Sequence, residues 1–155
     1  MTASVVCAVD DSPVAARVLR TAGRMSESLG LRLVVAHAVP VPAAPVPVTG
    51  RFPTGNYALP DPAHMEANRE AGEYLLKSVA ARSPEAEGAE LRTLVGDPAE
   101  SLLSLADEEA AALLVVGSRG RGPLKAALLG SVSSALATHA PCPVLIVPPD
   151  ASRLP

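Results

Sequence analysis

Aromatic side chains are nearly absent from this chain of 155 residues, which has one Phe, two Tyr and no Trp. Because apolar residues still make up 48% of the sequence, the core must be built from Val, Leu and Ala. The chain also lacks a basic surface interleaved with aromatics, and its net charge of −3 gives no general attraction to polyanions. We therefore expect neither nucleic acid nor a membrane as a partner.

Long apolar runs and cysteine motifs are missing as well. No apolar run reaches the roughly 18 residues of a membrane-spanning helix, and residues 1–12 do not resemble a signal peptide. The cysteines, Cys7 and Cys142, lie in apolar contexts without the spacing of a redox or metal motif. We expect a cytoplasmic protein with a single domain over residues 1–150 and a tail at 151–155.

Short β-branched runs alternate with longer amphipathic stretches. Ser12 is a candidate N-cap for a first helix that buries a face including Val18 and Leu29 and ends at Gly30. Strands are predicted over residues 4–9, 31–39, 89–95, 112–116 and 143–147, and helices after residues 12, 61 and 97, with helical spacing again from 124 to 136. This pattern predicts an α/β fold, an open doubly wound parallel sheet of five strands with helices on both faces.

Residues 40–62 form a long connection with seven prolines and two glycines, too many for a regular element. Phe52 and Tyr57 lie in it, and two roles stay open for them: covering a bound base or anchoring the loop. In a doubly wound sheet, ligands bind beyond the carboxyl ends of the strands at the switch point. The segments after the first and fourth strands, beginning at Asp10 and Gly117, are therefore the candidate site.

The segment after the fourth strand has spaced glycines. Gly120 follows Gly117 by three residues, and nine residues then separate it from Gly130 and Ser131. Glycine lets a backbone approach a ligand, and a helix restarting at Ser131 would offer free N–H groups to an anion. Positive charge comes from three side chains of the segment: Arg119, Arg121 and Lys125. We expect phosphate binding here, although the glycines alone are also compatible with a turn and with close helix packing.

The spacing Gly117-x2-Gly120-x9-Gly130-Ser131 resembles the G-2x-G-9x-G-[S/T] motif of the ATP-binding branch of the universal stress proteins. The resemblance covers nearly the whole chain, including AVDDS at 8–12, LVVAHAV at 33–39, GDPAE at 96–100 and APCPVLIVP at 140–148. It implies a Rossmann-like sheet in the order 3-2-1-4-5 and ATP as the ligand, with Mg2+ left open.

The resemblance also implies roles for individual residues. Asp10 would lie near the adenine and ribose, and Ala38 would offer its backbone to the adenine. The phosphates would be held by Gly117, Ser118, Arg119, Gly120, Arg121, Gly130, Ser131, Val132 and Ser133. Two departures from the family pattern stand out. Ala38 replaces a larger aliphatic residue, and Asp11 replaces a frequent Gly, where it would face water or hold a metal. His37 could approach the site, although a structural role for it is favoured.

The resemblance further implies a homodimer paired through the final strand, Pro143–Val147. An apolar edge strand needs covering, so the physical argument agrees. Three functions remain open: an ATP-binding stress-response regulator, a slow ATPase or phosphate-transfer enzyme, and a dimerisation module that binds no nucleotide. The sequence offers no residue to position an attacking water, and this favours the first.

Overall fold

The computed structural model describes residues 2–41, 61–118 and 129–149. Its five strands form one parallel sheet in the order β3-β2-β1-β4-β5, which confirms the predicted topology. The strands are β1 (Ser4–Ala8), β2 (Arg32–Val39), β3 (Glu90–Val95), β4 (Ala111–Gly117) and β5 (Val144–Val147).

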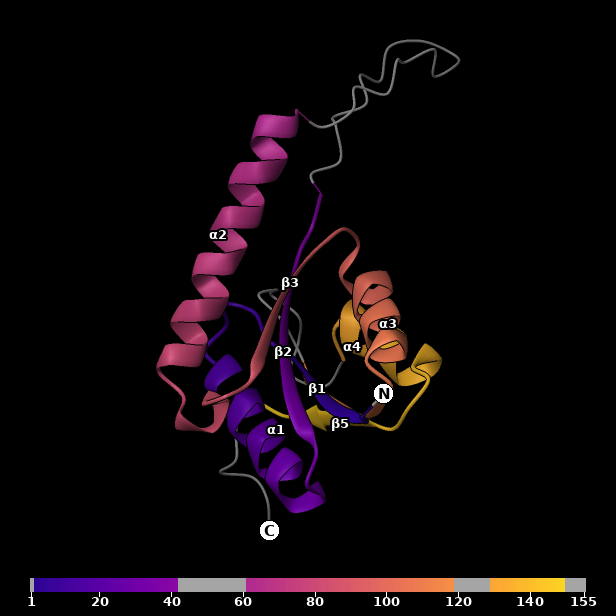
Figure 1. Cartoon of the computed structure of the whole chain (residues 1–155). Helices are drawn as coiled ribbons and strands as arrows, with labels where there is room; N and C mark the ends of the chain where they lie inside the picture. Colours follow the sequence, from indigo (N-terminus) through magenta and orange to yellow (C-terminus); the bar gives the residue numbers. More distant parts are fainter. Residues whose placement is uncertain (1, 42–60, 119–128, 150–155) are drawn as a thin grey trace.

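Helices cover both faces of the sheet (Figure 1). The helices are α1 (Ala15–Leu29), α2 (Pro62–Ala81), α3 (Pro98–Glu108) and α4 (Ser131–His139), with a short 3-10 turn, η1 (Pro84–Ala86), after α2. α1 and α2 lie on one face, and α3 and α4 on the other. No helix among the described residues is long and apolar enough to cross a membrane.

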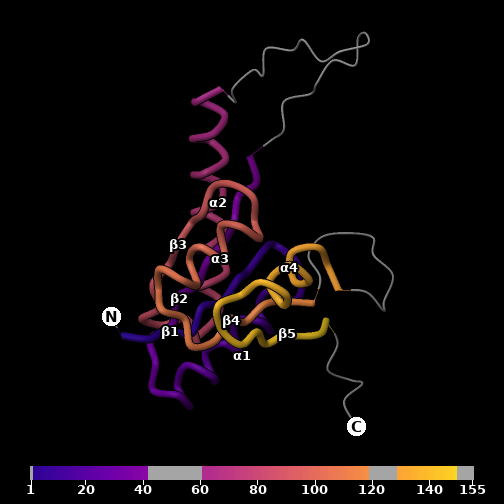
Figure 2. Tube along the Cα trace, turned by 90° about the vertical axis from the view of Figure 1, so that its right-hand side faces the viewer, coloured from indigo at the N-terminus to yellow at the C-terminus, as the bar shows by residue number. Residues whose placement is uncertain are grey.

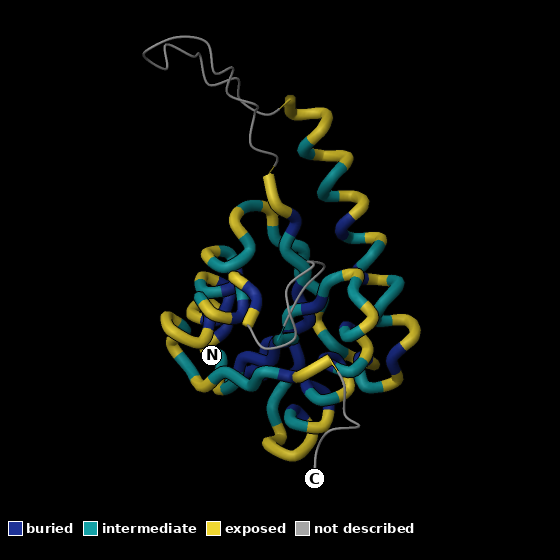
Figure 3. The backbone as a smooth tube through the Cα atoms, turned by 180° about the vertical axis from the view of Figure 1, so that it is seen from behind, coloured by how far each residue is buried: buried dark blue, intermediate teal, exposed yellow. Residues whose placement is uncertain are grey.

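Two aliphatic cores lie on opposite faces of the sheet. On β1, the side chains of Val5 and Cys7 join the core under α1 and α2, while Val6 joins the core under α3 and α4. This alternation follows from the two-residue period of a strand, and it explains why the buried strands have continuous apolar sequences. Figure 3 shows the buried residues gathered along the strands at the centre of the molecule.

The helices predicted after residues 61 and 97 begin where the sequence places them. Asp61 and Asp97 are the N-caps of α2 and α3, each followed by proline, and the Asp97 carboxylate accepts the Glu100 N–H at 2.9 Å. The predicted cap at Ser12 is wrong. The Ser12 N–H is itself bonded to Oδ1 of Asp10 at 2.9 Å, so the chain makes a further turn and α1 begins only at Ala15.

Two other expectations concern the end of α1 and the long connection after β2. Leu29 is 54% exposed because the buried stripe of α1 ends at Ser26, so its expected burial is wrong. Residues 42–60, with Phe52 and Tyr57, lie outside the described part of the chain. α2 follows them, and its first turns extend beyond the sheet (Figures 1 and 2).

Candidate functional site

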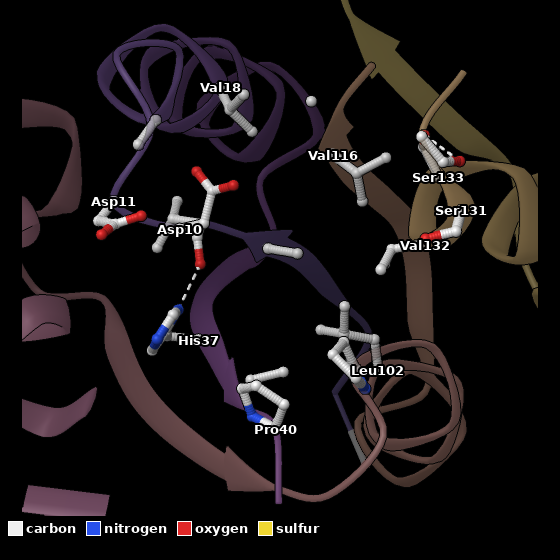
Figure 4. A pocket seen from close by; sticks show the side chains of 17 residues that line it. Asp10, Asp11, Val18, His37, Pro40, Leu102, Val116, Ser131, Val132 and Ser133 are labelled. Carbon is white, nitrogen blue, oxygen red and sulfur yellow. Dashed lines mark hydrogen bonds between the residues drawn. The ribbon is translucent and has the colours of Figure 1, made fainter. Parts of the chain in front are cut away.

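A cavity of about 480 Å³ opens at the carboxyl ends of β1, β2 and β4 (Figure 4). The chain builds β2 and β3 on one side of β1, and β4 and β5 on the other, so the winding reverses between β1 and β4. The cavity therefore lies at the switch point, where doubly wound sheets bind ligands. Its lining is Ala8, Val9, Asp10, Asp11, Ala15, Val18, His37, Ala38, Pro40, Pro98, Leu102, Val116, Gly117, Gly130, Ser131, Val132 and Ser133.

One wall of the cavity is acidic. Asp10 and Asp11 follow β1 directly, and the Asp10 carboxylate is oriented by the bond that its Oδ1 accepts from Ser12. Asp11 is exposed beside it. Within the described part of the chain, no group of three or more His, Cys, Asp or Glu side chains could hold a metal ion.

The end of β2 presents its backbone toward the cavity. The Ala36 carbonyl accepts the Val9 N–H at 2.9 Å, whereas the Val39 carbonyl accepts the Gly96 N–H after β3 at 3.0 Å. Because the N–H and C=O groups of a strand alternate sides, Ala38 points its N–H and C=O to the same side as Ala36, toward β1. The paired register of β1 and β2 ends at Ala8 and Ala36, so these groups of Ala38 lie beyond it at the cavity.

The opposite wall is the start of α4. Gly130 is its N-cap and makes no side-chain cap hydrogen bond. The first N–H groups of this nine-residue helix, starting with that of Ser131, therefore lie at the cavity. An N-terminus of this kind has free donors and a positive partial charge, the properties that bind a phosphate. The helix restart predicted at Ser131 is confirmed.

The two ends of the glycine-spaced segment are joined beside this helix. The Gly130 N–H donates to the Ser118 carbonyl at 2.8 Å, and the Ser118 N–H donates to the Val147 carbonyl at the end of β5 at 2.9 Å. The Ser133 hydroxyl is buried between the Ser118 and Gly130 carbonyls, at 3.0 and 3.1 Å. Its position indicates that Ser133 holds the ends of the segment together.

Of the eleven residues that the resemblance singled out, seven line the cavity and an eighth lies next to one of them. The seven that line it are Asp10, Ala38, Gly117, Gly130, Ser131, Val132 and Ser133. Ser118 lies next to Gly117 at the end of β4. The other three, Arg119, Gly120 and Arg121, fall outside the described residues, as does Lys125.

Several lining residues had no functional assignment from the sequence, and two of them come from α3. Pro98 and Leu102 come from the first turns of α3, and they line the cavity because β3 delivers that helix to the same end of the sheet. His37 lies at the end of β2, with its Nδ1 2.9 Å from the Val9 carbonyl oxygen. In the sequence, the only signal that His37 could approach the site was its position near the end of a predicted strand. No hydroxyl in the described lining is hydrogen-bonded to His37, so His37 is not paired with a nucleophile there.

Several known proteins are similar to this chain. The chain is 34% identical to a universal stress protein of Thermus aquaticus over 93% of this chain and 97% of the relative. It is 32% identical to the universal stress protein YxiE of Bacillus subtilis over 90% of this chain and 95% of the relative. A crystal structure of a universal stress protein in complex with cAMP superimposes with a TM-score of 0.65 at 29% identity, over 96% of this chain and 99% of that one. The family model described as the universal stress protein family matches residues 1–148, and the chain belongs to this family.

Proposed function

We propose that this chain binds ATP in the switch-point cavity and acts as a nucleotide-dependent regulatory module in the stress response. One observation carries the proposal: a single cavity has the free N-terminus of α4 on one wall and the Ala38 backbone with Asp10 on another. The first wall suits phosphates, and the second suits a base and a ribose hydroxyl. The cavity volume is in the range of small-molecule sites.

The similarity to a universal stress protein solved with cAMP supports an adenine nucleotide as the ligand class. The two arginines and one lysine of residues 119–125 support a ligand with more than one phosphate. Mg2+ belongs to the proposal only as an ion carried by the nucleotide. No described residue pair favours hydrolysis, so we propose binding without rapid turnover.

Isothermal titration of the purified protein with ATP tests the proposal. Ser131→Ala removes a hydroxyl at the start of α4 and should weaken ATP binding about tenfold, the effect of one hydrogen bond to a charged group. Ser134→Ala is the matched control, because Ser134 is exposed on the same helix and does not line the cavity. Absence of ATP binding at millimolar concentration, or equal effects of the two substitutions, would overturn it.

A homodimer through β5 is the second part of the proposal. Among the described strands β5 pairs with β4 alone, and its apolar residues are partly exposed at the sheet edge. The Pro143 and Val147 carbonyls bond to β4 and to Ser118, so by alternation the Val144 and Ile146 backbones face the free edge.

Sedimentation analysis of Ile146→Pro tests this edge, because the substitution removes one outward N–H from β5. We expect the wild type to sediment as a dimer and the variant as a monomer that still binds ATP. A wild-type monomer, or a variant that stays dimeric, would contradict dimerisation through β5. The cytoplasmic location and the single domain over 1–150 stay predictions.

A further inference from the structure

The last rung between β1 and β2 departs from the regular pattern of a parallel ladder. In such a ladder, the residue facing β2 donates its N–H to one residue of the neighbour and accepts from the residue two positions further on. Val9 obeys the first half of this rule, since its N–H donates to the Ala36 carbonyl at 2.9 Å. The regular partner for the Val9 carbonyl would be the N–H of Ala38.

The Val9 carbonyl is bonded to a side chain instead. Nδ1 of His37 lies 2.9 Å from that oxygen, and the paired register of the strands stops one residue earlier, at Ala8 and Ala36. Because a carbonyl oxygen only accepts, Nδ1 must carry a hydrogen. Figure 4 shows this contact at the cavity, with Asp10 and Asp11 on the same turn of chain.

α2 lies next to the His37 imidazole. Gly72 of α2 lies so close to β2 that a Cβ there would be 3.4 Å from Cδ2 of His37 and 2.4 Å from Cγ2 of Val39. His37 is therefore packed between a helix and the chain leaving β1.

We infer that His37 is a positioning residue that draws the Val9 carbonyl away from the Ala38 N–H and so keeps that N–H available to the ligand. This inference rests on the proposed function, because the Ala38 backbone is the group offered to the base. The same bond fixes the peptide that precedes Asp10, which orients the carboxylate beside the base. Without the imidazole, one more hydrogen bond would form between the two strands. The Ala38 N–H would then donate to the Val9 carbonyl and would not be available to a ligand.

Amide hydrogen exchange in the ligand-free, 15N-labelled protein tests the ladder directly. His37→Leu removes the competing donor, so the Ala38 amide should exchange at least about fivefold more slowly as it bonds to Val9. His37→Asn is the matched control, because its Nδ2 replaces Nδ1 at the same distance from the backbone. His37→Gln places its amide one bond further out and should behave like His37→Leu. Unchanged Ala38 exchange in His37→Leu would overturn the inference, as would His37→Asn matching His37→Leu.

Binding of two partial ligands provides the functional readout. Adenosine probes the base side and inorganic tripolyphosphate probes the α4 side. We expect His37→Leu to weaken adenosine binding about fivefold, the effect of one neutral hydrogen bond, and to leave tripolyphosphate binding unchanged. His37→Asn should restore adenosine binding. Equal losses for both probes would show a general structural defect and refute the inference. If the wild type binds neither probe, the proposed function fails, and the exchange experiment still decides the role of His37.

Discussion

Replacing Gly72 by Ala tests how tightly α2 is packed against the end of β2. The added Cβ would lie 2.4 Å from Cγ2 of Val39 and 3.3 Å from Cγ2 of Thr93. Nonbonded carbon atoms do not approach each other as closely as 2.4 Å, so either the Val39 side chain or the helix must move. Val39 is 8% exposed and β-branched, and Leu76, one turn along α2, is 1% exposed. Both neighbours therefore resist the movement.

Two opposing free energies decide the outcome. Alanine is better than glycine inside a helix by about 1 kcal/mol, which favours the variant. Overpacking a filled core costs about 1–3 kcal/mol. With a clash against two β-branched side chains, we take about 2 kcal/mol for the cost. Gly72→Ala should then lower the free energy of unfolding by about 1 kcal/mol.

Urea denaturation followed by far-UV circular dichroism measures this change as a lower midpoint at unchanged slope. Val39→Ala supplies the control, because it removes the clashing Cγ2. In the Gly72→Ala background, Val39→Ala should cost about 1 kcal/mol less than in the wild type. A Gly72→Ala protein as stable as the wild type, or more so, would show that α2 is free to move away and would refute the packing argument.

Two further predictions concern stability and reactivity. Asp97→Ala deletes the cap that accepts the Glu100 N–H at 2.9 Å and should cost about 1 kcal/mol in thermal melts, whereas the exposed Asp107→Ala on the same helix should stay within about 0.5 kcal/mol. Burial raises the thiol pKa of both cysteines, so less thiolate is present at pH 8 than in a free thiol. A thiol reagent should label the partly exposed Cys142 slowly, faster as pH rises, and the buried Cys7 only on unfolding; rapid labelling of Cys7 in the native state would contradict this.

The elements were predictable from the sequence where local chemistry determines them. Asp61 and Asp97 each precede a proline and an amphipathic stretch, and a cap depends only on the next few residues. The continuous apolar strands predicted a sheet buried on both faces, and the structure has one. The site was predictable in place, because the switch point follows from the order of strands and helices.

The remainder depends on contacts between distant parts of the chain. Asp10, not Ser12, makes the turn before α1, because the choice between adjacent polar residues depends on where β1 leaves the sheet. The bond of His37 to Val9 joins residues 28 positions apart and follows from the register of two strands. The resemblance placed Ser133 among the residues that hold the phosphates, and no pattern in the sequence indicates that the Ser118 and Gly130 carbonyls lie within reach of its hydroxyl.

The aliphatic cores have a practical consequence for spectroscopy. Tryptophan dominates protein absorption in the near ultraviolet, and this chain has none. Tyr74 is 78% exposed, so unfolding changes its surroundings little. The fluorescence of Tyr74 will therefore report poorly on folding. Because the polypeptide absorbs weakly in the near ultraviolet, a bound adenine is easy to detect. One equivalent of bound nucleotide would absorb more strongly than the polypeptide in the spectrum of a purified sample.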